Sequence, residues 1–230
     1  MKAATRLFAC VLVGMFAASA LGQIEPGVPG SYPSVAVKET PHNLNNYPAV
    51  TGTIPGNQVC LPCHTPHNAY PDPDGQIHQV LWNHEETDVS FTMYTTLSGQ
   101  TGSGPDGPSK MCLSCHDGVT AVDNYGNPWT GELVGGTTVM TGPRAIGRDA
   151  NLTDDHPIGI QYPADRPAEY RAETSFDPGI NSGPGVRLVT IDGVKRVECT
   201  SCHDPHNNGL GRFLRVPIQE SYICLQCHIK

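Results

Sequence analysis

The first apolar segment of the chain lies close to its beginning. Lys2 and Arg6 precede an apolar run at residues 7–17, and small residues follow up to Gly22. A basic start, a short apolar run and a small-residue end are typical of a secretory signal peptide. We therefore predict that residues 1–22 are a signal peptide and that the protein is exported. No later stretch approaches the roughly 18 apolar residues of a transmembrane helix, so no transmembrane segment is expected.

Beyond this leader, one segment carries a clear strand pattern. Residues 186–198 alternate apolar and polar side chains around Asp192-Gly193. Asp-Gly between two alternating runs predicts a β-hairpin. The stretches at 23–58 and 119–150 are rich in Gly and in small polar residues, which predicts loops. The pattern as a whole predicts a loop-rich chain with few, short strands.

Four motifs of the form CxxCH interrupt these loops, at residues 60–64, 112–116, 199–203 and 224–228. This spacing is the signature of c-type haem attachment, in which two thiols bond to the porphyrin and the next residue brings an imidazole to the iron. We expect short helical turns at each motif, because that geometry presents both thiols and the imidazole to one side. Four copies predict four covalent haems c, attached at Cys60, Cys63, Cys112, Cys115, Cys199, Cys202, Cys224 and Cys227, with His64, His116, His203 and His228 as proximal ligands.

Zinc binding and disulfide formation are the two alternatives for these cysteines. Zinc sites use pairs of cysteines, but zinc chemistry does not require a histidine directly after every second cysteine. A disulfide across two residues is strained and reactive, and it also leaves the adjacent histidine unexplained. Cys10 lies inside the predicted signal peptide, so every cysteine of the mature chain belongs to a CxxCH motif.

Composition changes the expected fold. Hydrophobic residues make up 38% of the chain, and it contains 25 Gly and 21 Pro, values that usually indicate disorder. Four large apolar macrocycles would supply the buried surface that the side chains lack. The predicted fold is therefore mostly irregular, with short α-helices and few short β-strands around a stacked chain of haems.

The chain repeats one order of motifs in its two halves. An upstream histidine, a CxxCHxPHN motif and a plain CxxCH occur at 42, 60–68 and 112–116, and again at 156, 199–207 and 224–228. Duplication of a two-haem unit explains this order. We predict a first dihaem half at 23–135, including an N-terminal arm, and a second at 136–230, joined as one continuous tetrahaem unit.

The remaining histidines exceed the open iron positions. His67 follows His64 by three residues, and the chain advances only about 3.3–3.6 Å per residue, so the two cannot bind opposite faces of one iron. His206 and His203 have the same spacing, which predicts that each second histidine ligates a neighbouring haem. The repeat favours a distal set of His42, His67, His156 and His206, with His84 as the next candidate in place of His42.

Four bis-histidine irons leave no vacant position for a substrate and have low potentials. We therefore expect an electron carrier, not an enzyme. Loss of the signal peptide removes two positive charges and takes the formal net charge from −8 to −10, which disfavours nucleic-acid binding.

The motifs CHTPHN, MCLSCHDG, DDHP, CTSCHDPH and ICLQCH resemble those of the doubled-CxxCH multihaem c-type cytochromes of metal-reducing bacteria, in particular their filament-forming outer-surface tetrahaem members. The resemblance covers nearly the whole mature chain. It implies an extracellular or cell-surface electron conduit of polymerised copies, in which a histidine of one copy ligates a haem of the next. His42 on the N-terminal arm ligates either within its own copy or between copies.

The resemblance also implies partners: other copies of the chain, other multihaem cytochromes as electron donors, and extracellular acceptors. A monomeric periplasmic shuttle is the nearest alternative, because it shares the haem chemistry and differs only in assembly. A multihaem reductase is a weaker alternative, because it needs one iron with an open position and nearby proton donors.

Overall fold

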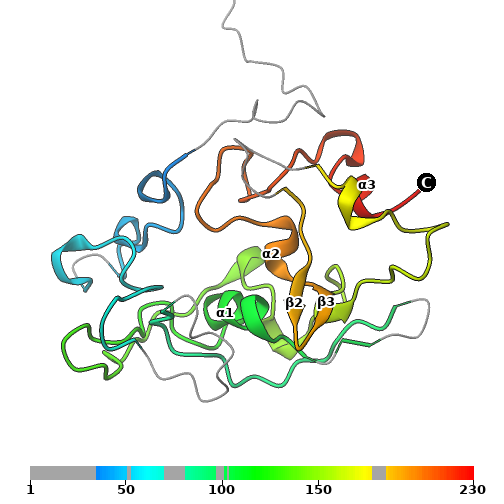
Figure 1. Ribbon diagram of the computed structural model, residues 1–230. Helices are drawn as coiled ribbons and strands as arrows, with labels where there is room; N and C mark the ends of the chain where they lie inside the picture. Colours follow the sequence, from blue (N-terminus) through cyan, green and yellow to red (C-terminus); the bar gives the residue numbers. More distant parts are fainter. Residues whose placement is uncertain (1–34, 51–52, 70–80, 97–100, 103, 178–184) are drawn as a thin grey trace, which may run out of the picture.

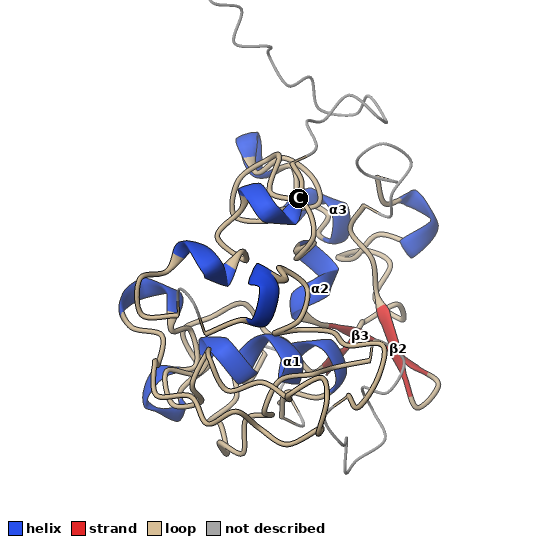
Figure 2. Ribbon diagram, turned by 90° about the vertical axis from the view of Figure 1, so that its left-hand side faces the viewer, coloured by secondary structure: helices blue, strands red, loops and turns tan. Residues whose placement is uncertain are grey.

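Loops make up most of the molecule, and the few helices and strands are short (Figures 1 and 2). The computed structural model describes residues 35–50, 53–69, 81–96, 101–102, 104–177 and 185–230. The predicted signal peptide lies outside the described residues. Within them, the predicted loop-rich class with short helices and few strands is confirmed.

The predicted hairpin at 186–198 is present. Strands β2 (Val189–Ile191) and β3 (Val194–Val197) pair antiparallel, with Ile191 opposite Val194. Asp192 and Gly193 between them have φ values of 51° and 77°, as a tight turn of type I′ requires. The two-residue strand β1 (Ile160–Gln161) adds to the other edge of β3. It is too short to leave a pattern in the sequence.

Helices lie at three of the four CxxCH motifs. They are α1 (Gly107–His116), α2 (Cys199–Cys202) and α3 (Cys224–Cys227). The first motif forms a turn, closed by the backbone N–H of His64 donating to the carbonyl of Cys60 at 2.8 Å. The predicted helical turns are therefore found at the motifs. Helices α1 and α2 pack against each other, with the hairpin beside them (Figure 1).

In the described part of the chain, seven single turns of 3₁₀ helix lie along the connecting loops. Three precede the first motif, three lie between the second and third motifs, and one lies before the fourth. Their bounds are Val37–Glu39, Leu44–Asn46, Pro55–Asn57, Gly142–Arg144, Arg148–Ala150, Glu173–Ser175 and Gln219–Ser221.

Two small apolar clusters form the protein core, one in each predicted half. The first consists of Val50, Ile54, Leu61, Val122 and Tyr125. The second consists of Val186, Leu214, Val216 and Ile223. Each cluster has few side chains, so neither half builds a large protein interior of its own. The exact boundary at 135/136 stays a prediction.

In each half the chain returns to its CxxCHxPHN motif in the same way. After the first motif, the N–H of Thr65 donates to the carbonyl of Leu81, and His64 forms a β-bridge with Trp82. The residue after this bridge, Asn83, donates its backbone N–H to the carbonyl of Cys63.

The second half repeats these bonds. The backbone N–H of Asp204 donates to the carbonyl of Phe213, and His203 forms a β-bridge with Leu214. The backbone N–H of Arg215 donates to the carbonyl of Cys202. The returning residue has positive φ in both halves, 53° at Leu81 and 55° at Phe213. The sequence repeat is thus also a repeat of backbone structure.

Among the described residues, no helix combines the length and the apolar character that crossing a bilayer requires.

Candidate haem sites

None of the eight motif cysteines forms a disulfide. Burial raises the pKa of the Cys63, Cys115 and Cys227 thiols to about 12 and that of Cys202 to about 11. A hydrogen bond with Cys112 lowers the pKa of the Cys199 thiol.

Three of the four motif histidines face another histidine ring. The centroid distances are 6.4 Å for His42 and His116, 5.9 Å for His64 and His206, and 6.4 Å for His156 and His228. Two imidazoles bonded to one metal ion at about 2 Å have centroids about 6 Å apart. The rings are thus spaced as axial ligands on opposite sides of one iron, which fits haem binding at these positions. The three pairs are His42 with His116, His64 with His206, and His156 with His228.

Backbone carbonyls orient the pair between the N-terminal arm and α1. The Nδ1–H of His116 donates to the carbonyl of Arg144 at 2.7 Å, and the Nδ1–H of His42 donates to that of Pro205 at 3.1 Å. A hydrogen bond at Nδ1 fixes the tautomer and leaves Nε2 as the metal ligand. Burial lowers the pKa of His42, which keeps its imidazole neutral, the form that ligates metals.

The pair of His64 and His206 joins the two halves of the chain. His64 belongs to the first motif, whereas His206 lies three residues after the proximal histidine of the third. The N–H of His206 donates to the Asp204 side chain at 3.0 Å, which holds the start of this loop. The structure therefore places His206 against a different motif from its own. Ligation by it stays a prediction.

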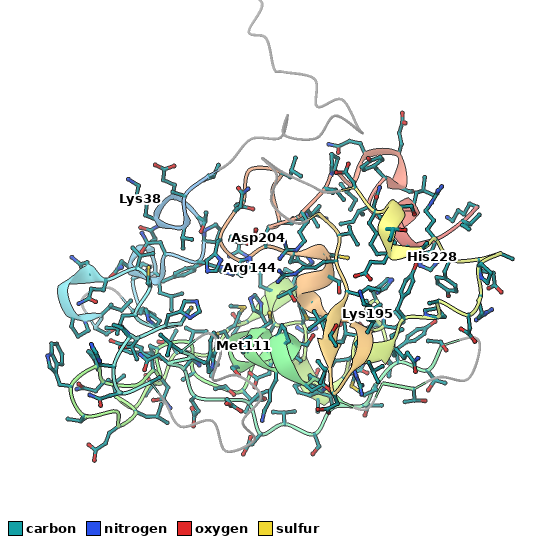
Figure 3. All side chains as sticks on the ribbon, viewed as in Figure 1. Lys38, Met111, Arg144, Lys195, Asp204 and His228 are labelled. Atoms are coloured by element: carbon teal, nitrogen blue, oxygen red, sulfur yellow. The ribbon has the colours of Figure 1, made fainter. Side chains whose placement is uncertain are left out.

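The pair of His156 and His228 lies within the second half. The Nδ1–H of His156 donates to the carbonyl of Pro157 at 3.1 Å. Tyr170 forms a β-bridge with His228, and their rings lie 5.1 Å apart. In Figure 3, His228 lies toward one side of the molecule, away from Arg144 and Asp204 near its middle.

His203 is oriented but has no histidine ring against it among the described residues. Its Nδ1–H donates to the carbonyl of Arg212 at 2.8 Å, so its Nε2 is free for an iron. The predicted distal ligand His67 is exposed. Among the described residues, three of the four motif histidines thus have a second histidine ring nearby.

His84, the predicted alternative to His42, is buried, and its role as a ligand stays a prediction. It is 1% exposed, its Nδ1–H donates to the carbonyl of Glu85 at 2.8 Å, and its Nε2 lies 3.5 Å from the Cys115 sulfur. His42, not His84, faces His116. Burial lowers the pKa of His84, so it is a neutral side chain packed beside an attachment cysteine.

The sequence reasoning missed a buried polar group between the second and third motifs. Glu198 is 1% exposed, accepts a hydrogen bond from the Ser109 hydroxyl and caps α2 together with Ser201. Burial and the nearby Asp106 carboxylate raise the pKa of Glu198 to about 8. A glutamate before a cysteine gives no sign of burial in the sequence, because α1 provides the contact.

Comparison with known proteins supports the haem assignment for the C-terminal motifs. The family model of the doubled CXXCH motif matches residues 192–230, which contain the third and fourth motifs. No curated protein is significantly similar to the chain. The CXXCH motifs indicate covalently bound c-type haem, and their number indicates a multihaem c-type cytochrome, a class whose members transfer electrons.

Proposed function

We propose that the chain binds four haems c, each with two histidine ligands, and transfers electrons along them. The observation that carries this proposal is the set of three histidine pairs with centroids 5.9–6.4 Å apart. Haem supplies one-electron chemistry at its iron when bound. The cysteines attach it, and the paired imidazoles hold the metal from both sides.

The fourth iron, at His203, takes His67 as its distal ligand in this proposal. His67 is the repeat equivalent of His206, and His206 faces the motif of the other half. His67 is exposed, so it is accessible either to its own chain or to a neighbouring copy. This position is where the proposal allows two copies to share a haem.

The proposed role is electron transfer without catalysis. A reductase of nitrite or of a sulfur oxyanion needs an iron that binds substrate, whereas in this proposal two histidines would hold each iron. Hydrogen bonds from Nδ1 to backbone carbonyls also hold four imidazoles in place; the carbonyls are those of Arg144, Pro205, Pro157 and Arg212. Ligands fixed in this way favour fast electron exchange, because little structure rearranges.

We propose that the protein is exported and assembles outside the cell as a homopolymer, which receives electrons from other multihaem cytochromes and passes them to external acceptors. The basic and apolar leader supports export. The likeness of the motifs to those of OmcE and related filament cytochromes supports polymerisation. A stack of haems that continues from copy to copy would extend the conduit.

A monomeric periplasmic shuttle is the second candidate, and one observation favours it. The ring of His42 faces His116 of the same chain at 6.4 Å, so the N-terminal arm has a ligand role without any neighbouring copy. The shuttle and the polymer share all haem chemistry. They differ in whether His67 serves its own chain or another.

Two measurements test the proposal. Pyridine haemochrome titration should give about four haems per chain. The reduced wild-type protein should bind no carbon monoxide, because two histidine ligands would leave no open position at any iron. Fewer haems or tight carbon monoxide binding would contradict the electron-transfer assignment. Electron microscopy of the native secreted protein decides assembly: fibres with a regular repeat support the polymer, and single particles support the shuttle.

A further inference from the structure

The imidazole of His42 is held from two directions by the loop after the third motif. Phe213 stacks on it with ring centroids 4.0 Å apart and an interplanar angle of 14°. The carbonyl of Pro205 accepts the hydrogen bond from its Nδ1–H at 3.1 Å. The stacking contact covers the face of the imidazole, and the hydrogen bond holds its edge. Together they restrict rotation of the His42 side chain about both χ1 and χ2.

The Phe213 ring is itself fixed by its backbone. The N–H of Phe213 donates to the Asn208 side chain at 2.9 Å, and its carbonyl accepts from the N–H of Asp204 at 2.7 Å. Its φ of 55° is left-handed, a conformation that is costly for a bulky residue and persists where the surrounding structure imposes it. The loop thus maintains an unfavourable backbone that points this ring at His42.

Among the described residues, the N-terminal arm has few other hydrogen bonds to this loop. The backbone N–H of Val35 donates to the Asn207 side chain at 3.0 Å. The N–H of His42 donates to the Thr40 hydroxyl within the arm. Val50 and Ile54 anchor the far end of the arm in the first core cluster. On either side of His42, however, the arm forms single helical turns, which by themselves do not hold a side chain rigidly.

From this geometry we infer that Phe213 is a positioning residue for His42, so that the second half of the chain sets the distal ligand of the haem at His116. The inference rests on the proposed function, because it requires His42 to be a ligand. Without the ring, the hydrogen bond to Pro205 alone leaves the imidazole free to turn about that bond. The distal position then opens part of the time.

A set of variants tests this directly in the full-length, haem-loaded protein. Phe213→Gly removes the ring at a position whose φ suits glycine, Phe213→Tyr keeps the stacking surface, and Leu81→Gly is the matched control at the equivalent position of the first half. His42→Leu removes the ligand itself. Each reduced protein is titrated with carbon monoxide, and each oxidised protein is examined by EPR for high-spin iron.

We expect no carbon monoxide binding in the wild type, Phe213→Tyr or Leu81→Gly. His42→Leu should bind about one equivalent per chain, because one iron loses a ligand. Phe213→Gly should bind a measurable amount, up to the amount bound by His42→Leu, and should show a high-spin signal. A structural role alone would lower stability in both glycine variants without this signal.

The outcomes separate the two claims. If His42→Leu binds no carbon monoxide, His42 is not a ligand and that part of the proposed function is wrong. If His42→Leu binds it and Phe213→Gly does not, the positioning role is wrong while the proposed function stands. Should Phe213→Gly fail to load haem, Phe213→Leu gives the same comparison, with Phe213→Tyr as its rescue.

Discussion

The two halves of the chain share a backbone path but use different side chains at equivalent positions. In the first half, the Asn83 amide donates to the carbonyl of Leu61 at 2.8 Å. In the second, the Arg215 guanidinium donates to the carbonyl of Thr200 at 2.8 Å. An amide and a guanidinium thus satisfy the same carbonyl inside each CxxCH turn. This difference shows that the carbonyl inside the turn requires a hydrogen-bond donor but not a particular residue.

The halves diverge where histidines meet other histidines. His206 of the second half faces His64 of the first, whereas its repeat equivalent His67 has no histidine ring against it among the described residues. The next equivalent pair, His84 and Val216, is buried in both halves, at 1% and 0% exposure. The repeat is therefore closer in backbone than in its arrangement of ligands.

The largest expected effect comes from removing the two equivalent histidines. His206→Leu should open the iron at His64 and give about one equivalent of carbon monoxide binding in the reduced protein. His67→Leu should open the iron at His203 to the same extent if the repeat extends to ligation. If His67→Leu keeps four haems and binds no carbon monoxide, the two halves differ in ligation as well.

Loss of the shared carbonyl donor should destabilise both halves. Asn83 is fully buried and bonds the carbonyls of Leu61 and Gly126, so Asn83→Ala should lower the free energy of unfolding by about 2–4 kcal/mol. Arg215→Ala should cost about 1–3 kcal/mol for the same reason. Guanidinium unfolding of the haem-loaded proteins measures both.

Asn68→Ala is the control for these variants. Asn68 also donates to two carbonyls, those of Pro128 and Trp129, but it is exposed. Water replaces its hydrogen bonds, so the expected change is below about 0.5 kcal/mol. Equal losses in Asn83→Ala and Asn68→Ala would contradict the argument from burial.

A buried acid distinguishes the third motif from the first. Glu198 precedes Cys199, where the first half has Val59 before Cys60. Between its ordinary pKa of 4.5 and its raised pKa of about 8, the folded protein keeps this proton while the unfolded chain has lost it. The free energy of unfolding therefore falls as pH rises through this range, by at most about 1.4 kcal/mol per pH unit.

Glu198→Gln should remove this part of the pH dependence and be relatively more stable than the wild type near pH 8. The charged and titratable groups that face Glu198 are Asp106 and Cys199; Ser109 provides its hydrogen bond. Denaturant unfolding of both proteins across pH 5–8 measures the difference. Parallel curves for variant and wild type would show that Glu198 is ionised when folded.

The smallest effect is expected where the first half is changed to match the second. His84→Val introduces the side-chain type of Val216 and removes one buried hydrogen bond, to the carbonyl of Glu85. The expected cost is about 1 kcal/mol, with unchanged haem content and no carbon monoxide binding. An opened iron in this variant would make His84 a ligand and would reverse the assignment to His42.

Local patterns predicted the parts of the structure that depend on near neighbours. The Asp192-Gly193 turn with its two alternating runs predicted β2 and β3, because turn geometry alone sets their register. The spacing within each CxxCH motif indicated covalent haem for a similar reason. The short strand β1 and the burial of Glu198 were missed, since both depend on distant segments.

The sequence by itself determined where the CxxCH motifs lie, which histidine follows each pair of cysteines, and that the histidines outnumber the motifs. These features are set by covalent spacing, which no fold alters. Tertiary structure alone decided that His42 faces His116 and that His206 crosses to His64, because such pairs join segments far apart in the chain. It also decided that Phe213 stacks on His42, since that contact depends on how the arm and the loop pack.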